Sequence, residues 1–299
     1  MIIQKPLVSI IINCFNGEKY LEEALKSVYN QSYTNWEIIF WDNQSTDKSL
    51  KILEKNNHPK IRYFYAKKFT ELGEARELAF KKSKGEWISF LDCDDIWMPN
   101  KLSEQIKIIN ENQCNYGFIY SKCHIFVDRI NRKKILVRKK AIQPCKDNLE
   151  SIKVNKELFK GNFLPFPSIL YNRKAMIKAG KFSFYKFSPD YYLNLYISQE
   201  YEVYGINKIL CLYRFHNTNL SKSIREIGIL EAIDIIYRLT PKAKADILSK
   251  THKIRYVLFL ITRFKFKKSY RYLCDLGIRN SVFALFEIFF YFLKFKTKV

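Results

Sequence analysis

The chain has 299 residues, of which 52 are Lys or Arg and 29 are Asp or Glu, so its formal net charge is +23. Hydrophobic residues make up 47% of the chain and aromatic residues 16%, which excludes a disordered protein, and the scarcity of glycine and proline excludes a collagen-like one. The length allows one large domain or two of ordinary size. The excess of positive charge predicts a polyanionic partner, which can be nucleic acid, an anionic membrane surface or a phosphorylated substrate.

Strands and helices are predicted to alternate over the first hundred residues. Short β-branched or aromatic runs predict strands at 7–12, 37–41, 61–65 and 87–91. Apolar residues at helical spacing predict helices at 18–28, at 73–82 and from a cap at Ser45 or Thr46 towards residue 55. This alternation is typical of an α/β fold with a mostly parallel sheet flanked by helices.

The second half of the chain is less regular. Strands are predicted at 116–127 and 135–137, joined as an antiparallel hairpin around the basic turn 129–134, and again at 168–171 and 206–215. From about residue 221 the pattern becomes helical, with a break at Pro241. We find no internal repeat.

Seven cysteines are spread along the chain without a CxxC pair or a histidine cluster at zinc-ligand spacing. This pattern of cysteines predicts free, mostly buried thiols in a protein of a reducing compartment. No apolar stretch of signal-peptide length precedes the first predicted strand, and no window holds the roughly 20 uncharged apolar residues that span a bilayer. We therefore expect a cytoplasmic protein.

Polar clusters follow three of the predicted strands, at 13–16, 42–47 and 92–95. Ligands of open α/β sheets bind outside the carboxyl ends of the strands, so these clusters predict a functional site. In an extended segment Asp92 and Asp94 lie on one face and could converge on a cation, for which oxygen ligands favour Mg²⁺ or Mn²⁺. The alternative is an acidic turn that caps a helix beginning near Pro99.

The order and spacing of these motifs resemble those of family 2 glycosyltransferases over about residues 6–222. The segments that carry the resemblance are 8–12, 15–16, 41–47, 75–76, 84–86, 90–95, 97–102, 161–163, 167–168, 180–182, 189–191 and 213–216. The resemblance implies a GT-A fold, with a nucleotide-sugar-binding half at 1–115, an acceptor-binding half at 116–222 and a basic helical extension at 223–299.

The resemblance also implies the roles of individual residues. It predicts a donor site formed by Asn16, Asp42, Arg76 and Asp92. Asp42 matches the residue that holds the uracil or ribose of the donor. The alternative is a structural aspartate that is favoured near a helix N-terminus by the helix dipole. For Arg76, contact with the donor diphosphate and an ion pair on the helix surface remain alternatives.

A divalent cation, Mn²⁺ or Mg²⁺, is expected at Asp94, which matches the family's metal-coordinating position. The cation would bridge the donor diphosphate and stabilise charge on the leaving group. We also assign His216 to the metal site, and the alternative is a structural histidine at the end of a strand.

Asp190 matches the catalytic base, which takes the proton from the acceptor hydroxyl during a single inverting displacement. The alternative, which is compatible with catalysis, is that the segment 188–190 begins a helix. The sequence departs from the family pattern at several positions: Asn13 for proline, Asn43 for aspartate, Gln44 for glycine, Glu77 for asparagine and Pro189 for glutamate. None of these departures removes a carboxylate that the mechanism needs.

The last 59 residues, 241–299, carry 14 Lys or Arg and 3 Asp or Glu, a net charge of +11. The apolar runs 282–286 and 288–293 within them are too short to span a bilayer but suit a helix at the surface of an anionic membrane. Docking on the catalytic region or a dimer contact is the alternative. We expect an enzyme that is peripheral on the inner face of the membrane.

The expected function is transfer of a sugar from a nucleotide diphosphate donor, with a UDP-sugar expected, to an acceptor hydroxyl. The pathway would assemble cell-surface polysaccharide, lipooligosaccharide or a lipid-linked glycan. The alternatives are a sugar-nucleotide pyrophosphorylase-like enzyme, although no glycine-rich loop follows the first strand, and a non-catalytic nucleotide-sugar-binding homologue. Nucleic acid is not an expected partner, because no pattern of a nucleic-acid reader is found.

Overall fold

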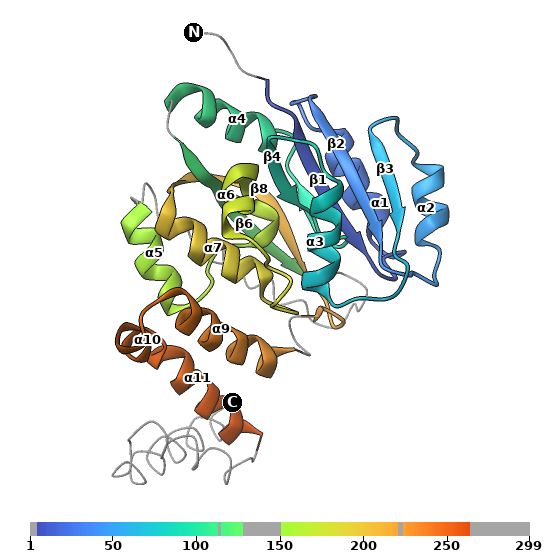
Figure 1. Cartoon of the computed structure of the whole chain (residues 1–299). Helices are drawn as coiled ribbons and strands as arrows, with labels where there is room; N and C mark the ends of the chain where they lie inside the picture. The colour runs from blue at the N-terminus through green and yellow to red at the C-terminus, as the bar shows by residue number, and fades with distance from the viewer. Residues whose placement is uncertain (1–4, 113–114, 128–150, 221–223, 264–299) are drawn as a thin grey trace.

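The computed structural model describes residues 5–112, 115–127, 151–220 and 224–263 (Figure 1). The strands are β1 (Val8–Cys14), β2 (Trp36–Asp42), β3 (Ile61–Tyr65), β4 (Trp87–Phe90), β5 (Ile96–Trp97), β6 (Tyr116–Val127), β7 (Leu170–Asn172) and β8 (Glu202–Phe215). The helices of the first 150 residues are α1 (Leu21–Tyr29), α2 (Ser49–Lys55), α3 (Leu72–Lys82) and α4 (Lys101–Asn112). The later helices are α5 (Ser151–Lys160), α6 (Arg173–Ala179), α7 (Pro189–Glu200), α9 (Arg225–Leu239), α10 (Lys242–Leu248) and α11 (Lys250–Thr262).

The described strands form one mixed sheet of eight, in the order β3-β2-β1-β4-β7-β6-β8-β5. The first four strands of the chain pair in parallel, with β1 between β2 and β4, as their alternation with helices predicts. β7 is antiparallel to both β4 and β6, whereas β6 and β8 are parallel to each other. The hairpin expected from β6 to 135–137 lies outside the described residues.

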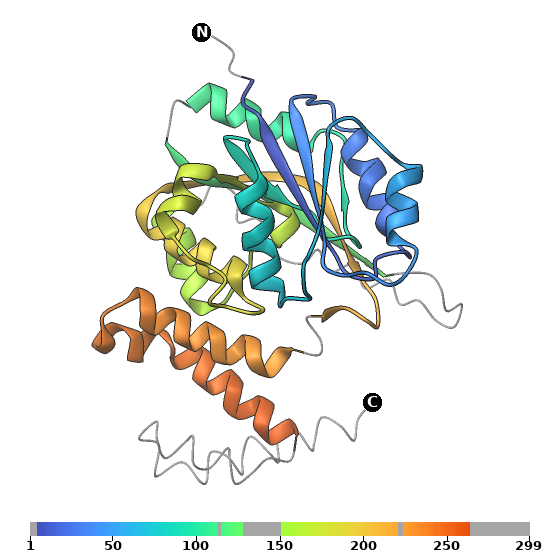
Figure 2. The same cartoon turned by 45° about the vertical axis from the view of Figure 1, so that its right-hand side comes forward.

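Helices cover both faces of the sheet, because successive residues of the buried strands point to opposite sides (Figure 2). Val8, Ile10 and Ile12 of β1 pack with residues of α1, α2 and α4. Ile11 and Ile39 instead join a second core with residues of α3, α5, α6 and α7. Burying one such aliphatic side chain stabilises the fold by about 1.5–3 kcal/mol.

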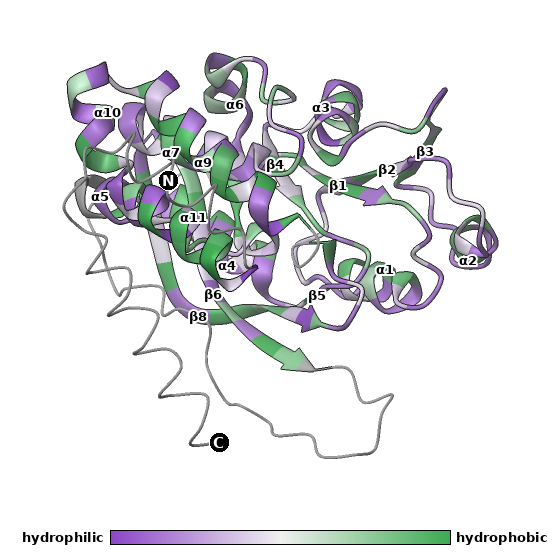
Figure 3. Cartoon of the chain, turned by 90° about the horizontal axis from the view of Figure 1, so that it is seen from below, coloured by the Kyte–Doolittle hydropathy of each residue, from purple (hydrophilic) through white to green (hydrophobic). Residues whose placement is uncertain are grey.

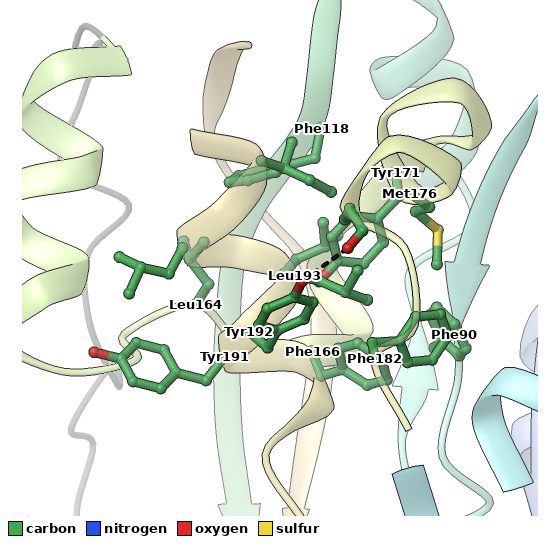
Figure 4. Close-up of a cluster of buried hydrophobic side chains, with 14 of the residues drawn as sticks. Phe90, Phe118, Leu164, Phe166, Tyr171, Met176, Phe182, Tyr191, Tyr192 and Leu193 are labelled. Carbon is green, nitrogen blue, oxygen red and sulfur yellow. Dashed lines mark hydrogen bonds between the residues drawn. The ribbon is translucent and has the colours of Figure 1, made fainter. Parts of the chain in front are cut away.

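An aromatic cluster stabilises the junction of β4, β6 and β7 in the second core (Figure 4). The ring of Phe90 stacks on that of Phe166 with centroids 4.7 Å apart and meets Tyr171 edge-on at 6.3 Å. Phe118 of β6 contacts the other side of Tyr171 at 5.8 Å. Residues of α7 belong to the same core, and the hydroxyl of Tyr171 donates a hydrogen bond to Asn194 of this helix at 2.6 Å, so the cluster connects α7 to the sheet.

The helices α9, α10 and α11 follow the sheet and lie at one end of the molecule, below α5 and α7 in Figure 1. As the sequence predicts, the helical pattern breaks at Pro241, which is the N-cap residue of α10. No helix in the described part of the chain is long and apolar enough to cross a membrane. The expected surface helix at 282–293 lies outside the described residues.

The cysteines that the structure describes are free thiols, in agreement with the expectation. Cys14, Cys123 and Cys211 are buried, and Cys93 is partly buried. The remaining cysteines lie outside the described residues.

Candidate active site

The polar segments that follow β1, β2 and β4 meet at one edge of the sheet. Cys14 at the end of β1 lies opposite Asp42 at the end of β2. On the other side of β1, the amide of Leu91 donates a hydrogen bond to the carbonyl oxygen of Ile11 at 3.0 Å, so the acidic segment 92–95 continues beside the end of β1. The parallel register therefore brings together three clusters that are about 30 and 50 residues apart in the chain.

Asn16 connects the loops that follow β1 and β2. Its side-chain oxygen accepts a hydrogen bond from the amide of Thr46 at 2.8 Å, and its own amide donates to Ser45 Oγ at 3.1 Å. Asn16 and Gln44 both adopt left-handed backbone conformations, with φ of 54° and 69°, which non-glycine residues rarely do. The observed role of the Asn16 side chain is to fix the shape of the loops around the site, and donor contact by this residue stays a prediction.

The predicted cap of α2 is wrong. The helix begins at Ser49, not directly after Ser45 or Thr46, and its N-cap residue makes no side-chain cap hydrogen bond. Asp47 Oδ1 instead accepts from the amide of Ser49 at 2.9 Å. Ser45 and Thr46 are unavailable as caps because their polar groups contact Asn16 across the site.

Asp42 is buried, with 1% of its surface exposed, and both carboxylate oxygens have donors. Oδ1 accepts from the amide of Ser45 at 2.7 Å, and Oδ2 accepts from the hydroxyl of Tyr63 at 3.2 Å. Burial and the negative charge of Asp42 raise the pKa of Tyr63, so this hydroxyl stays protonated as a donor. The half-exposed rings of Phe15 and Phe69 pack edge to face at 4.9 Å on the loops that follow β1 and β3.

Tyr63 is not among the site residues predicted from the sequence. The signal that could have found it is the two-residue period of a strand. Tyr63 lies opposite Phe40, and Asp42, two residues beyond Phe40, is on the same face of the sheet.

Two departures from the family pattern have structural partners. The side chain of Asn43 donates to the Thr70 carbonyl oxygen at 2.8 Å and accepts from the Thr70 hydroxyl at 3.1 Å, which holds the chain after β3 against the end of β2. Glu77 accepts from the amide of Ser183 at 2.8 Å and pairs with Lys81 at 2.9 Å. Both residues therefore connect segments around the site.

Arg76 of α3 forms a buried ion pair with Asp92. Its Nη2 lies 2.8 Å and 3.1 Å from the two carboxylate oxygens, and its guanidinium stacks over the ring of Phe166 at 4.1 Å. The ion pair offered as the alternative for Arg76 therefore exists, but it does not lie on the helix surface, because Arg76 is only 5% exposed. Asp92 keeps about a third of its side chain exposed, at the open side of the pair.

Asp94 contacts His216, which is 122 residues further along the chain. The Asp94 Oδ2 lies 2.8 Å from His216 Nε2, and the other ring nitrogen lies 2.9 Å from the hydroxyl of Thr218. Asn219 donates to the same carboxylate oxygen at 3.4 Å. Burial and the charge of Asp92 raise the pKa of Asp94, and the contact with His216 opposes this shift.

Arg214, at the end of β8, positions the acidic segment. Its amide donates to Asp95 Oδ1 at 3.0 Å, its Nε donates to the carbonyl oxygen of Asp94 at 2.9 Å, and its Nη2 pairs with Glu23 at 2.7 Å. Burial raises the pKa of Asp95 well above its usual range. Asp95 therefore serves as a buried anchor of the loop and not as an exposed ligand.

Asp92 and Asp94 do not converge as the sequence predicted, because both oxygens of Asp92 face Arg76. Within the described residues, no group of three or more His, Cys, Asp or Glu side chains could hold a metal ion. Asp94 and His216 nevertheless offer one oxygen and one nitrogen ligand in a partly buried position where a cation would relieve carboxylate repulsion. This pair fits a divalent ion that takes its remaining ligands from a substrate diphosphate and water.

Asp190 lies in the first turn of α7, which begins at Pro189. Its Oδ2 accepts from the side-chain amide of Asn162 at 2.7 Å. The oxygen of Asn162 accepts in turn from Asn194 at 3.2 Å, and the oxygen of Asn194 accepts from the Tyr171 hydroxyl at 2.6 Å. This chain of hydrogen bonds runs into the core and orients the carboxylate, although proline replaces the family's glutamate at position 189.

The charge environment places Asp190 beside the Arg76–Asp92 pair. Burial raises the pKa of Asp190, the positive charge of Arg76 lowers it, and the negative charge of Asp92 raises it. A carboxylate with a raised pKa that has a fixed orientation is suited to accept a proton from a hydroxyl group. The predicted residues Asp42, Arg76, Asp92, Asp94, Asp190 and His216 thus lie around one edge of the sheet.

A mixed sheet with helices on both faces and carboxylates at the ends of its parallel strands is the architecture of nucleotide-sugar transferases of the GT-A type. The family model described as glycosyl transferase family 2 matches residues 9–188, and the chain belongs to this family. The fold and the family predicted from the sequence are confirmed.

Among the relatives is an Escherichia coli protein named UDP-Glc:alpha-D-GlcNAc-diphosphoundecaprenol beta-1,3-glucosyltransferase. It is 32% identical over 221 residues, which cover 73% of this chain and 80% of that protein. The fold is similar to that of Staphylococcus aureus TarS in complex with UDP-GlcNAc, with a TM-score of 0.58 and 18% identity over 81% of this chain and 70% of that one. It is also similar to a Pyrobaculum calidifontis mannosyltransferase in complex with GDP-Man and Mn²⁺, with a TM-score of 0.59 and 13% identity over 95% and 79% of the two chains.

Proposed function

We propose that this glycosyltransferase moves a sugar from a UDP-sugar to an acceptor hydroxyl, with inversion at the anomeric carbon, in the assembly of a polysaccharide or a lipid-linked glycan. The observation that carries this proposal is the position of Asp190. It is oriented by Asn162 at 2.7 Å and lies within the electrostatic reach of Arg76 and Asp92. The other carboxylate that acts on Asp190, Asp92, is held by Arg76 and is therefore not available as a nucleophile.

The residues support a single displacement. Asp190 accepts the proton of the acceptor hydroxyl while that oxygen forms its bond to the anomeric carbon on the face opposite the leaving group. The bond between the anomeric carbon and the diphosphate oxygen breaks, and its electron pair leaves with the nucleoside diphosphate. Because one base acts and no covalent intermediate forms, the single displacement inverts the configuration at the anomeric carbon.

The donor end of the site is assigned to Asp42 and its surroundings. The Asp42 carboxylate would accept a hydrogen bond from a uracil N–H or a ribose hydroxyl at Oδ2 once the hydroxyl of Tyr63 moves aside, because Asp42 is otherwise buried. The rings of Phe15 and Phe69 provide exposed apolar surface for a base. The Escherichia coli relative is named for UDP-Glc, which favours UDP, whereas the Pyrobaculum neighbour is in complex with GDP-Man.

Asp94 and His216 are the residues that would hold a divalent cation, which in this site would stabilise negative charge on the departing diphosphate. Arg76 contributes a fixed positive charge on the other side of the acidic segment. Asn219 and Thr218 keep the imidazole and the carboxylate of this pair in place.

A screen of nucleotide sugars tests the function directly. With Mn²⁺, we expect one UDP-sugar at about 100 times its Kd to add about 2.7 kcal/mol to the free energy of unfolding, which a thermal-shift assay detects as a rise in Tm. The same donor should be hydrolysed slowly to UDP and free sugar. A pyrophosphorylase-like enzyme would instead form sugar 1-phosphate from the donor and pyrophosphate, and a non-catalytic homologue would bind the donor without turnover.

We further propose that residues 1–222 form the catalytic region and that the C-terminal extension, 223–299, binds an anionic membrane surface. Hydrophilic and hydrophobic residues are interspersed along helices α9 to α11 (Figure 3). Several of the hydrophobic ones are exposed. Ile247 is 74% exposed, and Ile227 and Ile254 are each 44% exposed. Apolar side chains among lysines are typical of a surface that contacts the lipid headgroup region.

Cosedimentation with liposomes tests membrane binding. We expect the full chain to sediment with vesicles that contain phosphatidylglycerol and to stay in the supernatant with phosphatidylcholine alone. Raising the salt concentration should release it, because exposed charges are screened. If the protein stayed in the supernatant with anionic vesicles at low salt, the membrane assignment would be wrong.

A further inference from the structure

A cavity of about 270 Å³ lies between the start of α7 and the helices α9 and α11. Asp190 and Asn162 line one side of it, and residues of α9 and α11 line the other. The cavity therefore includes the proposed catalytic base, and neither Arg76 nor Asp92 lines it. Its volume is just under the usual range for small-ligand pockets, so it suits one compact group and not a whole oligosaccharide.

Two arginines give this cavity a positive charge. Arg225 is the first residue of α9, and the N-terminus of this helix adds a partial positive charge of its own. Arg255 belongs to α11. Both side chains are solvent-accessible. Within the described residues, neither guanidinium forms an ion pair or a hydrogen bond with a carboxylate.

A glycine lets one of these arginines approach the loop that carries Asn162. Gly161 has φ of 149°, and a Cβ atom at this position would lie only 2.6 Å from Nη1 of Arg255. Any other residue would displace the guanidinium from the cavity wall. Arg255 is therefore positioned directly beside the residue that orients Asp190.

The floor of the cavity is neutral. His252 is 4% exposed, and burial together with the charge of Arg255 lowers its pKa to about 4, so it is uncharged at neutral pH. Its Nε2 lies 3.2 Å from the carbonyl oxygen of Phe159, which can only accept a hydrogen bond, so this nitrogen carries the proton. The positive charge of the cavity thus comes from the two arginines, and the Asp190 carboxylate on the other side offsets part of it.

We propose that this cavity binds a phosphate or diphosphate ester of the acceptor, with Arg225 and Arg255 as its ligands. The inference rests on the proposed function, in which the acceptor hydroxyl reaches Asp190. A guanidinium binds a phosphate through paired hydrogen bonds, and these two arginines would break no ion pair with the described part of the chain when they do so. An acceptor sugar between Asp190 and the arginines would present its hydroxyl to the base and its anomeric phosphate to the cavity.

Isothermal titration calorimetry with geranyl diphosphate tests the site. The full chain is titrated in EDTA, which removes any contribution of a cation at Asp94. We expect the dissociation constant to rise by about tenfold or more in Arg225→Gln and in Arg255→Gln, and further in the double variant. Arg238→Gln, an exposed arginine of α9 that does not line the cavity, is the matched control and should bind as the wild type does.

Two further ligands separate the possible results. UDP binding with Mn²⁺ should be the same in all these variants, because the donor end of the site is intact. If the wild-type protein binds UDP but not geranyl diphosphate, the inference is overturned and the proposed function stands. If the wild-type protein does not bind UDP, the proposed function itself is contradicted. Binding of inorganic pyrophosphate without binding of geranyl diphosphate assigns the cavity to a free anion. Geranyl diphosphate binding that is kept in the arginine variants and is competed by UDP assigns the ester to the donor site. Either result overturns the inference.

Discussion

Asp190→Asn should lower the turnover number of sugar transfer by about 10²–10⁴-fold, the range that a positioned general base contributes. The amide keeps the shape of the carboxylate but cannot accept the proton of the acceptor hydroxyl. Binding of the UDP-sugar should be unchanged, because Asp42 and the Asp94–His216 pair are intact. Steady-state kinetics together with calorimetric donor binding measure the two effects separately.

Glu200→Gln is the matched control for this substitution. Glu200 lies at the other end of α7 and forms an exposed ion pair with Lys178 at 2.9 Å, which contributes little to stability. The control should transfer sugar at the wild-type rate. A turnover number of Asp190→Asn near that of the wild type would show that another group takes the proton.

The pH profile gives an independent test of the same assignment. The base acts only when it is ionised, and burial raises the pKa of Asp190 above its ordinary 3.8. The value of kcat/KM should therefore fall as the pH drops through this raised pKa, and Asp190→Asn should lose this acid limb. Asn162→Ala removes a hydrogen bond to the carboxylate, so it should move the limb to higher pH while retaining more activity than Asp190→Asn.

Asp94→Ala should abolish the metal dependence of donor binding. We expect the dissociation constant for UDP in the presence of Mn²⁺ to rise by at least about 10–100-fold, the loss that follows removal of even an outer-shell partner of a metal site. The reason is that Asp94 supplies the carboxylate of the proposed cation pair and His216 alone cannot replace it. Calorimetry with and without Mn²⁺ measures the difference.

Glu22→Gln controls for the loss of one negative charge, since Glu22 is exposed and pairs only with Lys26 of its own helix in the contacts described. It should bind UDP as the wild type does. Full transfer activity of the wild type in excess EDTA would rule out a metal requirement, and Asp94 would then be a structural residue that holds His216.

The local pattern of the sequence predicted the parallel half of the sheet well. The strands expected at 7–12, 37–41, 61–65 and 87–91 match β1 to β4 to within one or two residues. β1, β2 and β4 are buried along nearly their whole length, so each appears as a nearly continuous apolar run bounded by polar residues, and no distant contact is needed to recognise it. β3 lies at the edge of the sheet and is only partly buried, and its aromatic residues are what marked it as a strand. The cap of α2 was wrong because Ser45 and Thr46 have partners on another loop, which local spacing does not indicate.

The sequence by itself determined which carboxylates are present at the strand ends and, through their order, the family to which the chain belongs. Only the tertiary structure decided how those groups are paired. Arg76 turned out to be buried against Asp92, Asp94 contacts a histidine 122 residues away, and Asn162 orients Asp190 from a separate loop. The physical reason is that secondary structure follows from periodicities of two and 3.6 residues, whereas these contacts depend on the order of strands in the sheet and on the packing of α3, α7 and β8 at one edge of it.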